Sequence, residues 1–213
     1  MIVLHVEAPF ATFRKSFARG YAESYPLAPP ATVYGMLLSL VGERLRIVHE
    51  GVRLAFAYRN IPRIATTLRK LSRLKYGVAA KQSELGNQPD YIETVCGLDF
   101  LCWVDSTEEP NSERTLESRL RTALFEPEAI ERYGVVCLGL SDDAVDTVSP
   151  LDSVHGEWLR LRPSDEGPME LPIWVDHVGS ELTRWRRFEI DDTAQPVDAG
   201  PGPTWEWVTI SRS

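Results

Sequence analysis

The order of the first three elements expected from the sequence constrains the fold more than any other feature. A β-branched run at 2–7 (IVLHVE) predicts a central strand. Apolar side chains at helical spacing then predict a helix over about 33–48, with Thr32 as its N-cap. Alternating residues in 51–62 predict the second strand. Strand, helix and strand in this order are typical of ferredoxin-like or RNA-recognition-motif-like α+β domains.

The same order of elements recurs in the middle of the chain. Residues 91–105 alternate as one long strand or a strand pair, and a helix capped by Asn111 or Ser112 follows. The apolar segment 134–141 then predicts a buried strand. Two such units predict a four-stranded antiparallel sheet with both helices on one face.

Charge is distributed unevenly along the chain, although its net value is −8. Residues 1–81 hold 13 basic and 4 acidic residues, a balance of +9, whereas the remaining 132 residues hold 10 basic and 27 acidic residues, a balance of −17. This asymmetry indicates a polyanion or an anionic surface as partner of the N-terminal side. The alternative, that the charges only form solvated faces, stays open at this point.

The loop expected between the first strand and the helix, residues 10–30, combines basic and aromatic side chains. Cations hold phosphates and exposed rings stack on bases, so we interpret this loop as a nucleic-acid-binding edge. At least one of Phe10, Phe13 and Phe17 is expected to anchor the loop in the core instead. Gly35, in the first helical turn, would let a phosphate or another backbone approach closely, or would pack the helix on the sheet.

Residues 60–91 are rich in cations and lack a clear core periodicity, which predicts a protruding basic arm. The alternative is a surface helix at 66–76 using Leu68, Leu71 and Leu74. Loop, strand end and arm together resemble surfaces that bind single-stranded RNA. The residues predicted to contact RNA on these segments are Arg14, Lys15, Arg19, Tyr21, Tyr25, Arg59, Arg69, Lys70, Arg73, Lys75 and Lys81.

Motifs for bound-nucleotide, zinc or serine-hydrolase chemistry are missing from the sequence, so no metal, cofactor or catalytic residue is expected. A weak alternative is metal-free RNA cleavage, which needs a His, Tyr or Lys beside a bent phosphate. The histidines are expected to be structural, and none adjoins the arm: His5, His49, His155 and His177. The cysteines are expected to be buried thiols: Cys96, Cys102 and Cys137.

From residue 142 the chain becomes acidic and proline-dotted, which marks a boundary between residues 1–141 and 142–213. Four alternating segments predict a small β-rich appendage packed on the N-terminal sheet and facing away from RNA. These segments are 155–161, 169–178, 183–190 and 204–210. No signal peptide and no membrane-spanning stretch is found, so a soluble, cytoplasmic protein is expected.

Two motifs in the loop resemble those of a known family. The pattern F-R-x-x-x-x-R followed by Y-P-x-x-P-P-[AS]-T-V-x-G-[ML]-L is similar to the CRISPR-associated RAMP subunit of type I Cascade complexes that holds the 5′ handle of the guide RNA (Cas family five). Residues 132–141 (RYGVVCLGLS) are similar to a second block of that family. The first pattern reads Phe13-Arg14 through Arg19, then Tyr25-Pro26-Leu27-Ala28-Pro29-Pro30-Ala31-Thr32-Val33-Tyr34-Gly35-Met36-Leu37. The resemblance covers 1–141 well and 142–213 loosely.

The resemblance implies a RAMP domain whose arm is a thumb that contacts guide RNA beside the backbone subunit. The protein would cap the 5′ handle, bind the large subunit that reads the PAM, and lie near target DNA, in antiviral defence or RNA-guided DNA targeting. Thr32 and Tyr34 join the expected RNA-binding residues through the motif. I-C members cut precursor RNA through a Lys-His and Tyr arrangement, but here Gln82 follows Lys81, so binding without cleavage is expected. I-B-related or transposon-linked variants look most similar.

Overall fold

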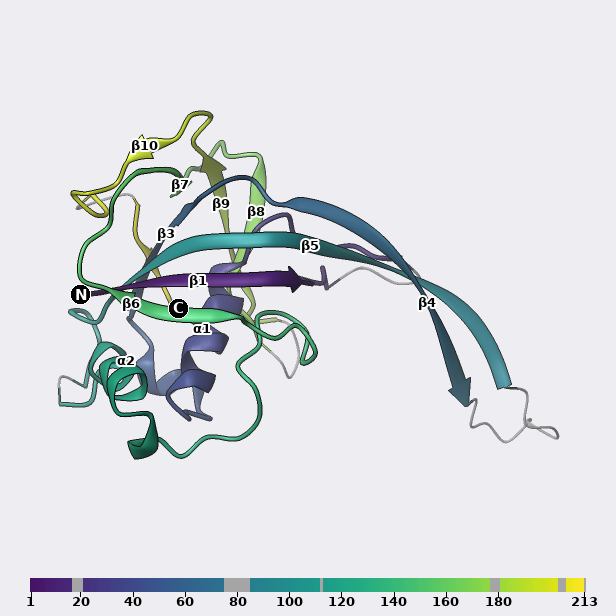
Figure 1. Cartoon of the computed structure of the whole chain (residues 1–213), viewed down its shortest axis with the longest axis horizontal. Coiled ribbons are helices and arrows are strands. Elements are labelled where there is room, and N and C mark those ends of the chain that lie inside the picture. The colour runs from purple at the N-terminus through teal and green to yellow at the C-terminus, as the bar shows by residue number, and fades with distance from the viewer. Residues whose placement is uncertain (17–20, 75–84, 112, 177–180, 203–205, 213) are drawn as a thin grey trace.

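One sheet runs through most of the chain and carries two helices (Figure 1). The computed structural model describes residues 1–16, 21–74, 85–111, 113–176, 181–202 and 206–212, with the backbone alone for 70–74 and 85–88. The elements are β1 (Ile2–Ala11), β2 (Tyr21–Ala22), α1 (Pro30–Leu40), η1 (Arg46–His49), β3 (Arg53–Tyr58), β4 (Arg63–Leu74), β5 (Leu85–Asp105), α2 (Leu116–Phe125), η2 (Pro127–Ala129), β6 (Thr147–Leu151), β7 (Glu157–Pro163), β8 (Met169–Trp174), β9 (Arg184–Ile190), β10 (Gln195–Pro196) and β11 (Val208–Thr209).

Hydrogen bonding orders the strands β6-β1-β5-β3-β7-β9-β8, and every pairing along this path is antiparallel. The long strand β5 lies between β1 and β3, with Val104 opposite both Ile2 and Leu54. The predicted strands at 2–7, 51–62 and 91–105 are therefore confirmed. The first four strands of the path are also the strands that flank the two helices in the sequence.

The main core lies between the sheet and both helices. Alternation along β3 directs Leu54, Phe56 and Tyr58 to this core, as the sequence predicts. The rings of Tyr58 and Phe100 stack at 5.4 Å between centroids. From α2, Leu120 enters the same core and is fully buried. Both helices therefore cover one face of the sheet.

Helix α1 begins earlier than predicted. Its N-cap is Pro29, whose carbonyl oxygen accepts the backbone N–H groups of Thr32 and Val33 at 2.9 and 3.0 Å. Thr32 is therefore in the first turn and is not the cap, because proline at N1 already has the helical φ angle. The helix also ends at Leu40 and does not reach residue 48. Gly42 follows with φ +68°, and a Cβ there would lie 2.2 Å from a backbone oxygen.

Helix α2 is capped by Thr115, whose Oγ1 accepts the Ser118 N–H at 3.2 Å. The sequence prediction of Asn111 or Ser112 was therefore wrong by three or four residues. Asn111 instead accepts the Glu113 N–H at 3.2 Å before the helix, and Ser112 lies outside the described residues. A side-chain oxygen directly before the first helical residue satisfies an N–H that the helix cannot.

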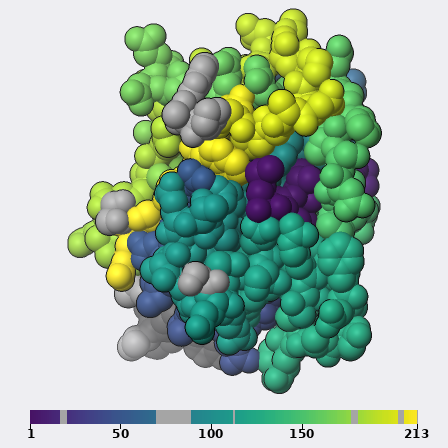
Figure 2. Space-filling view, turned by 90° about the vertical axis from the view of Figure 1, so that its left-hand side faces the viewer, coloured from purple at the N-terminus to yellow at the C-terminus, as the bar shows by residue number. Residues whose placement is uncertain are grey.

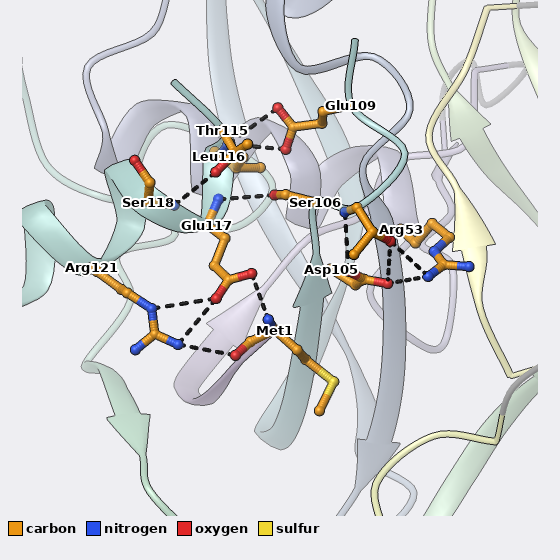
Figure 3. A network of polar contacts seen from close by, with 11 residues as sticks. Met1, Arg53, Asp105, Ser106, Glu109, Thr115, Leu116, Glu117, Ser118 and Arg121 are labelled. Carbon is orange, nitrogen blue, oxygen red and sulfur yellow. Dashed lines mark hydrogen bonds and ion pairs between the residues drawn. The ribbon is translucent and has the colours of Figure 1, made fainter. Parts of the chain in front are cut away.

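A polar network fixes the first turn of α2 to the start of the chain (Figure 3). The carboxylate of Glu109 accepts the Leu116 N–H at 3.0 and 3.2 Å. Glu117 binds the amino group of Met1 at 2.6 Å and also Arg121 at 3.1 Å. Glu117 and Arg121 thus form an i,i+4 ion pair on α2.

Below α2, charged groups form a buried network. The Arg119 guanidinium donates to Glu43 at 2.6 Å, to His49 Nε2 at 3.1 Å and to the Val41 carbonyl at 2.8 Å. Because Nε2 accepts from an arginine, Nδ1 carries the proton and donates to Glu109 at 2.7 Å. The side chains of His49 and Glu109 have no exposed surface. This network links α1, η1 and α2.

The C-terminal strands extend the sheet, whereas the sequence predicted an appendage packed on it. Strand β7 pairs with β3 through Leu161 and Phe56, and β9 and β8 continue outward. Leu161, Leu171 and Phe188 belong to the main core, so residues 142–213 share that core. Without the C-terminal strands, β3 would be an edge strand with unpaired backbone groups, and β7 pairs with it there. Alternation in the sequence does not show which edge a strand joins.

On the helix-free side, C-terminal segments cover one end of the sheet. A second apolar cluster there includes Ala55, Trp103, Trp158 and Val197. The space-filling view of the end opposite the arm shows C-terminal segments (yellow) beside the first residues (purple) (Figure 2). This cover keeps Ala55 and Ala57, on the second face of β3, from water.

Residues 134–141 do not form the predicted strand. Within them the structure has an isolated bridge from Cys137 to Ala144 and a buried Leu138. The partner of β1 is instead β6, with His5 opposite Ser149. Left-handed glycines explain the difference, because Gly134 and Gly139 have φ angles of +77° and +115°.

The three cysteines are free thiols. Cys102 is buried as predicted, and burial raises the pKa of its thiol well above the usual range. Cys96 and Cys137 are only half-buried. In the described part of the chain, no helix has the length and apolar character needed to cross a membrane.

Candidate nucleic-acid interface

The segment after β1 returns on itself as a short ribbon. The N–H groups of Lys15 and Tyr25 donate to the carbonyls of Glu23 and Phe13, both at 2.9 Å. Phe13 is 3% exposed and anchors the ribbon in the core, as one of the three phenylalanines was expected to do. Asp143 holds the base of the ribbon by accepting the Thr12 N–H at 2.7 Å. Residues 17–20, at its tip, lie outside the described residues.

The predicted arm is a two-stranded antiparallel extension of the sheet. Strand β4 pairs with β5 from Arg63 opposite Cys96 to Leu74 opposite Leu85, and Figure 1 shows both strands leaving the body together. The alternative of a helix at 66–76 is therefore wrong. The described side chains of β4 from Arg63 to Arg69 are all exposed, so Leu68 does not pack in a core.

Glu93 joins the ribbon to the arm. Its two carboxylate oxygens accept the Tyr21 hydroxyl and the Ser24 N–H, each at 2.9 Å. The Tyr21 hydroxyl also lies 3.2 Å from Thr66 Oγ1 on β4. Three elements far apart in the sequence therefore form one continuous surface.

This shared surface carries exposed rings and apolar side chains. Tyr21 and Tyr91 lie 6.3 Å apart and are 40% and 45% exposed. Leu68 is 60% exposed beside Tyr91 in the strand register, and Arg63 and Ile64 are exposed nearer the body. Rings and cations in this arrangement can stack on bases and hold phosphates. Ile64 and Tyr91 were not predicted from the sequence, because only the strand register of the structure places Tyr91 opposite Leu68.

The predicted cations of the ribbon have different environments. Arg14 is exposed, whereas Lys15 is half-buried, forms an ion pair with Glu23 at 3.0 Å and lies 5.9 Å from the Tyr25 ring centre. Arg19 lies outside the described residues. Of these two cations, only Arg14 is exposed to solvent, whereas Lys15 lies against the buried Tyr25 ring.

Two predicted stacking residues lie in the core. Tyr25 is 7% exposed, and burial together with the nearby Glu170 charge raises the pKa of its hydroxyl to about 12. Tyr34 has no exposed surface, donates its hydroxyl to the Arg46 carbonyl at 2.5 Å, and its pKa is raised beyond the usual range mainly by burial. Neither ring can stack on a base here, because both rings are buried. Thr32 is half-buried in the first turn of α1.

The predicted cations of the arm are only partly described. Arg69 is exposed and lies 3.5 Å from Asp142. For Lys70 and Arg73 the structure gives the backbone positions on β4, and Lys75 and Lys81 lie outside the described residues.

At the end of β3, the predicted Arg59 lies over the Trp158 ring at 3.6 Å and near Asp99 at 3.8 Å. The Nε2 atom of His5 lies 2.8 Å from the same carboxylate. With Glu7, His5 and Asp99 place one ligand atom each within 4.8 Å of one another, which could hold a cation. The carboxylate of Asp99 is already shared by His5 and Arg59, so an ion pair network accounts for this group without a metal.

A cavity of about 580 Å³ lies beside α1 and was not predicted. Its lining includes Gly35, Arg44, Arg132 and Tyr133. The Arg44 guanidinium lies 5.2 Å from the centre of the Tyr133 ring, which is 72% exposed. A Cβ at Gly35 would meet no atom within 4 Å, so the helix–sheet packing interpretation of this glycine is wrong. The space in front of Gly35 remains open to a ligand.

Comparison with known proteins identifies the family. The chain is 38% identical over 194 residues to the CRISPR-associated protein Cas5 of Myxococcus xanthus (strain DK1622), covering 90% of this chain and 91% of that protein. No family model matches the chain. The chain therefore belongs to the CRISPR-associated Cas5 family, which confirms the resemblance found in its loop motifs.

Solved structures share the fold. A chain of a CRISPR RNA-guided surveillance complex superposes with a TM-score of 0.65 at 11% identity, covering 95% of this chain and 94% of that chain. A second structure, of a Cas protein, gives a TM-score of 0.53 at 13% identity, covering 95% and 98%. At these identities the likeness concerns the fold alone, a mixed α/β architecture built mainly on an antiparallel sheet.

Proposed function

We propose that this protein is a subunit of a type I CRISPR effector (Cascade) complex that binds and caps the 5′ handle of the guide RNA. The family and the fold likeness to a surveillance-complex chain support membership of such a complex. The strand order β6-β1-β5-β3, with helices after β1 and β5, supports a ferredoxin-like, RAMP-type domain. In this proposal the strands of the C-terminal region beyond β6 widen that domain.

The observation that carries the proposal is the continuous surface made by the ribbon and the arm through Glu93. RNA single strands are bound by cations along the backbone and by rings that stack on splayed bases. Arg14, Arg63 and Arg69 are exposed along this surface, and Tyr21 and Tyr91 supply the rings. The exposed side chains of β4 from Arg63 to Arg69 support contact with a backbone subunit as well as with RNA.

The large subunit and target DNA next to the PAM complete the proposed set of partners. The exposed Tyr133 and its cavity lie on the helix side, where a further subunit or the handle could bind beside Gly35. The proposal assigns no reaction to the protein: it acts by holding RNA in the complex.

The test is co-expression with the other effector subunits and a repeat–spacer array. Arg14→Glu and the double variant Arg63→Glu/Arg69→Glu are expected to lower guide RNA content and complex yield at least about tenfold, because a reversed charge repels phosphates. Arg114→Glu is the matched control, since Arg114 is exposed just before α2, the helix that Figure 1 shows at the end opposite the arm. Unchanged yield and guide content in both arm and ribbon variants would contradict the proposal.

One arrangement favours precursor-RNA cleavage as a second candidate. His5 and Asp99 are 2.8 Å apart with Arg59 beside them, and a carboxylate that orients an imidazole is a common feature of general bases. Incubating the purified protein with repeat RNA in EDTA, with His5→Ala in parallel, separates the candidates. We expect bound but intact RNA; cleavage that His5→Ala abolishes would make the protein a processing nuclease.

A further inference from the structure

Strand β9 carries a run of four exposed residues, Arg184 to Arg187, three of them arginines. A strand with one buried face alternates between buried and exposed side chains. Here alternation begins only at Phe188, which is fully buried. The exposed half of β9 pairs with β8 alone, because pairing with β7 is limited to residues 188–190. Both faces of this half therefore reach solvent.

The arginines of this run differ from those of the neighbouring strand β7. On β7, Arg160 pairs with Asp191 at 3.0 Å and Arg162 pairs with the same carboxylate at 2.9 Å. Among the described residues, neither Arg186 nor Arg187 has an ion pair or a side-chain hydrogen bond. Glu170 lies opposite Arg187 across the β8–β9 pairing, but its carboxylate forms no ion pair with either arginine, so both guanidinium charges remain available to a ligand.

Beside this run, Trp185 faces a groove. The indole is 38% exposed and lies 6.2 Å from the Tyr25 ring. The groove has a volume of about 420 Å³ and runs between the ribbon and β8, with Lys15, Met169 and Glu170 in its lining. An exposed indole can stack on an unpaired base. Strand alternation places Arg187 on the same face of β9 as Trp185, whereas Arg184 and Arg186 project from the other exposed face.

We propose that β9 and this groove bind single-stranded RNA, with one base stacked on Trp185 and phosphates held by Arg184, Arg186 and Arg187. This inference rests on the proposed function, because Lys15 of the ribbon also lines the groove. It extends the RNA path into residues 142–213, the region that the charge balance predicted to face away from RNA. Net charge over a long segment does not describe a local cluster of arginines.

The groove also suggests which base it takes. Glu170 is exposed in its lining and offers only hydrogen-bond acceptors. Acceptors of this kind pair with exocyclic amino groups, such as cytosine N4. A base that carries an amino group therefore fits the groove better than uracil.

The experiment measures binding of the full chain to fluorescein-labelled oligocytidine and oligouridine RNA across a salt series. We expect Arg186→Ala/Arg187→Ala to weaken binding by about tenfold and to lower the salt slope by about 1.4, since each single-strand phosphate contact contributes about 0.7. Trp185→Ala should weaken binding by about tenfold and Trp185→Phe by less, since a phenyl ring also stacks. Glu170→Gln should remove the preference for oligocytidine.

Controls separate this inference from the function on which it rests. Arg114→Ala removes an exposed arginine at the far end and should change nothing. If Arg14→Glu weakens binding but the β9 variants do not, the β9 site is wrong and the proposed function stands. If neither set weakens binding, both are wrong. Loss of subunit co-purification with unchanged RNA affinity, or tighter binding of DNA of the same sequence, would also overturn the β9 site.

Discussion

Arg119 and Arg186 mark two regions of the protein that use arginine in opposite ways. The side chain of Arg119 is 10% exposed, and its guanidinium donates to Glu43, His49 and a backbone carbonyl. That of Arg186 is exposed and, in the described part of the chain, contacts no carboxylate. The first arginine is part of the folded core, whereas the second contributes a charge that the fold does not use.

The difference shows where to look for function in a chain of this composition. Arginines that form ion pairs within the fold, such as Arg53 with Asp105 and Glu108, answer a structural need. Arginines without an ion-pair partner, beside exposed rings, stay hydrated by water, and a bound ligand can replace that water. Replacing an arginine that is paired within the fold should therefore lower stability, whereas replacing an unpaired, exposed arginine should weaken binding.

The largest effect is expected for Arg119→Met. The variant keeps much of the side-chain volume but leaves Glu43, His49 and the Val41 carbonyl without their donor. Removing one partner of a buried charged pair costs about 3–5 kcal/mol. Urea unfolding followed by circular dichroism should show a loss in this range, with an unchanged m-value.

Arg121→Met is the matched control for that experiment. Arg121 lies on the same helix, but its side chain is 50% exposed, so its pair with Glu117 should contribute little. Similar losses for both variants would mean that burial of Arg119 does not set its contribution.

Alkaline pH should separate buried from exposed tyrosines. The pKa of Tyr25 is raised to about 12 by burial first and then by Glu170, and burial raises the pKa of Tyr34 and Tyr58 still further. In the unfolded chain these hydroxyls ionise near pH 10. The unfolded state therefore loses protons first, and stability should fall as pH rises from about 10 to 12.

Absorbance at alkaline pH measures this titration directly. The native protein should leave the buried tyrosines protonated near pH 11, whereas denatured protein ionises all of its 7 tyrosines. Tyr25→Phe should reduce the loss of stability above pH 10. Complete ionisation in folded protein at pH 11 would be incompatible with the buried position of Tyr25.

A smaller effect is expected for Thr115→Ala, which removes the N-cap of α2. Loss of a capping side chain costs about 1 kcal/mol. Thr115→Ser should restore most of the stability in thermal or urea unfolding, because the hydroxyl can still accept the Ser118 N–H. Asn111→Ala is the control, since the sequence favoured Asn111 as a cap and the structure places it before the helix.

Much of the fold could be predicted because it depends on local periodicity. Alternation located β3 and β5, and the cation-rich, core-free stretch located the arm. The 134–141 segment could not be predicted, because its conformation depends on groups that are distant in the sequence. Gly139, for example, packs against the Thr12 carbonyl from across the molecule, so closely that a Cβ at this position would lie 2.6 Å from the carbonyl oxygen.

The candidate site was predictable only in outline. The motif that identified the family also placed Tyr25 and Tyr34 among RNA-binding residues, yet both pack in the core. A sequence motif shows which residues the family requires. It does not separate residues that contact RNA from residues that hold the loop and helix in place. The arginines of β9 escaped notice because their region is acidic on average, and only the structure shows which of its cations lack partners among the described residues.

The smallest effect on stability is expected for Arg186→Ala/Arg187→Ala. Unlike Arg119→Met, this variant should not lower the stability of the fold. Neighbouring like charges repel, so removing them should leave the melting temperature unchanged or slightly raised at low salt, with no difference at high salt. Differential scanning fluorimetry at two salt concentrations measures this. A melting temperature lowered as far as that of Arg119→Met would show that the β9 arginines belong to the folded core and not to a binding surface.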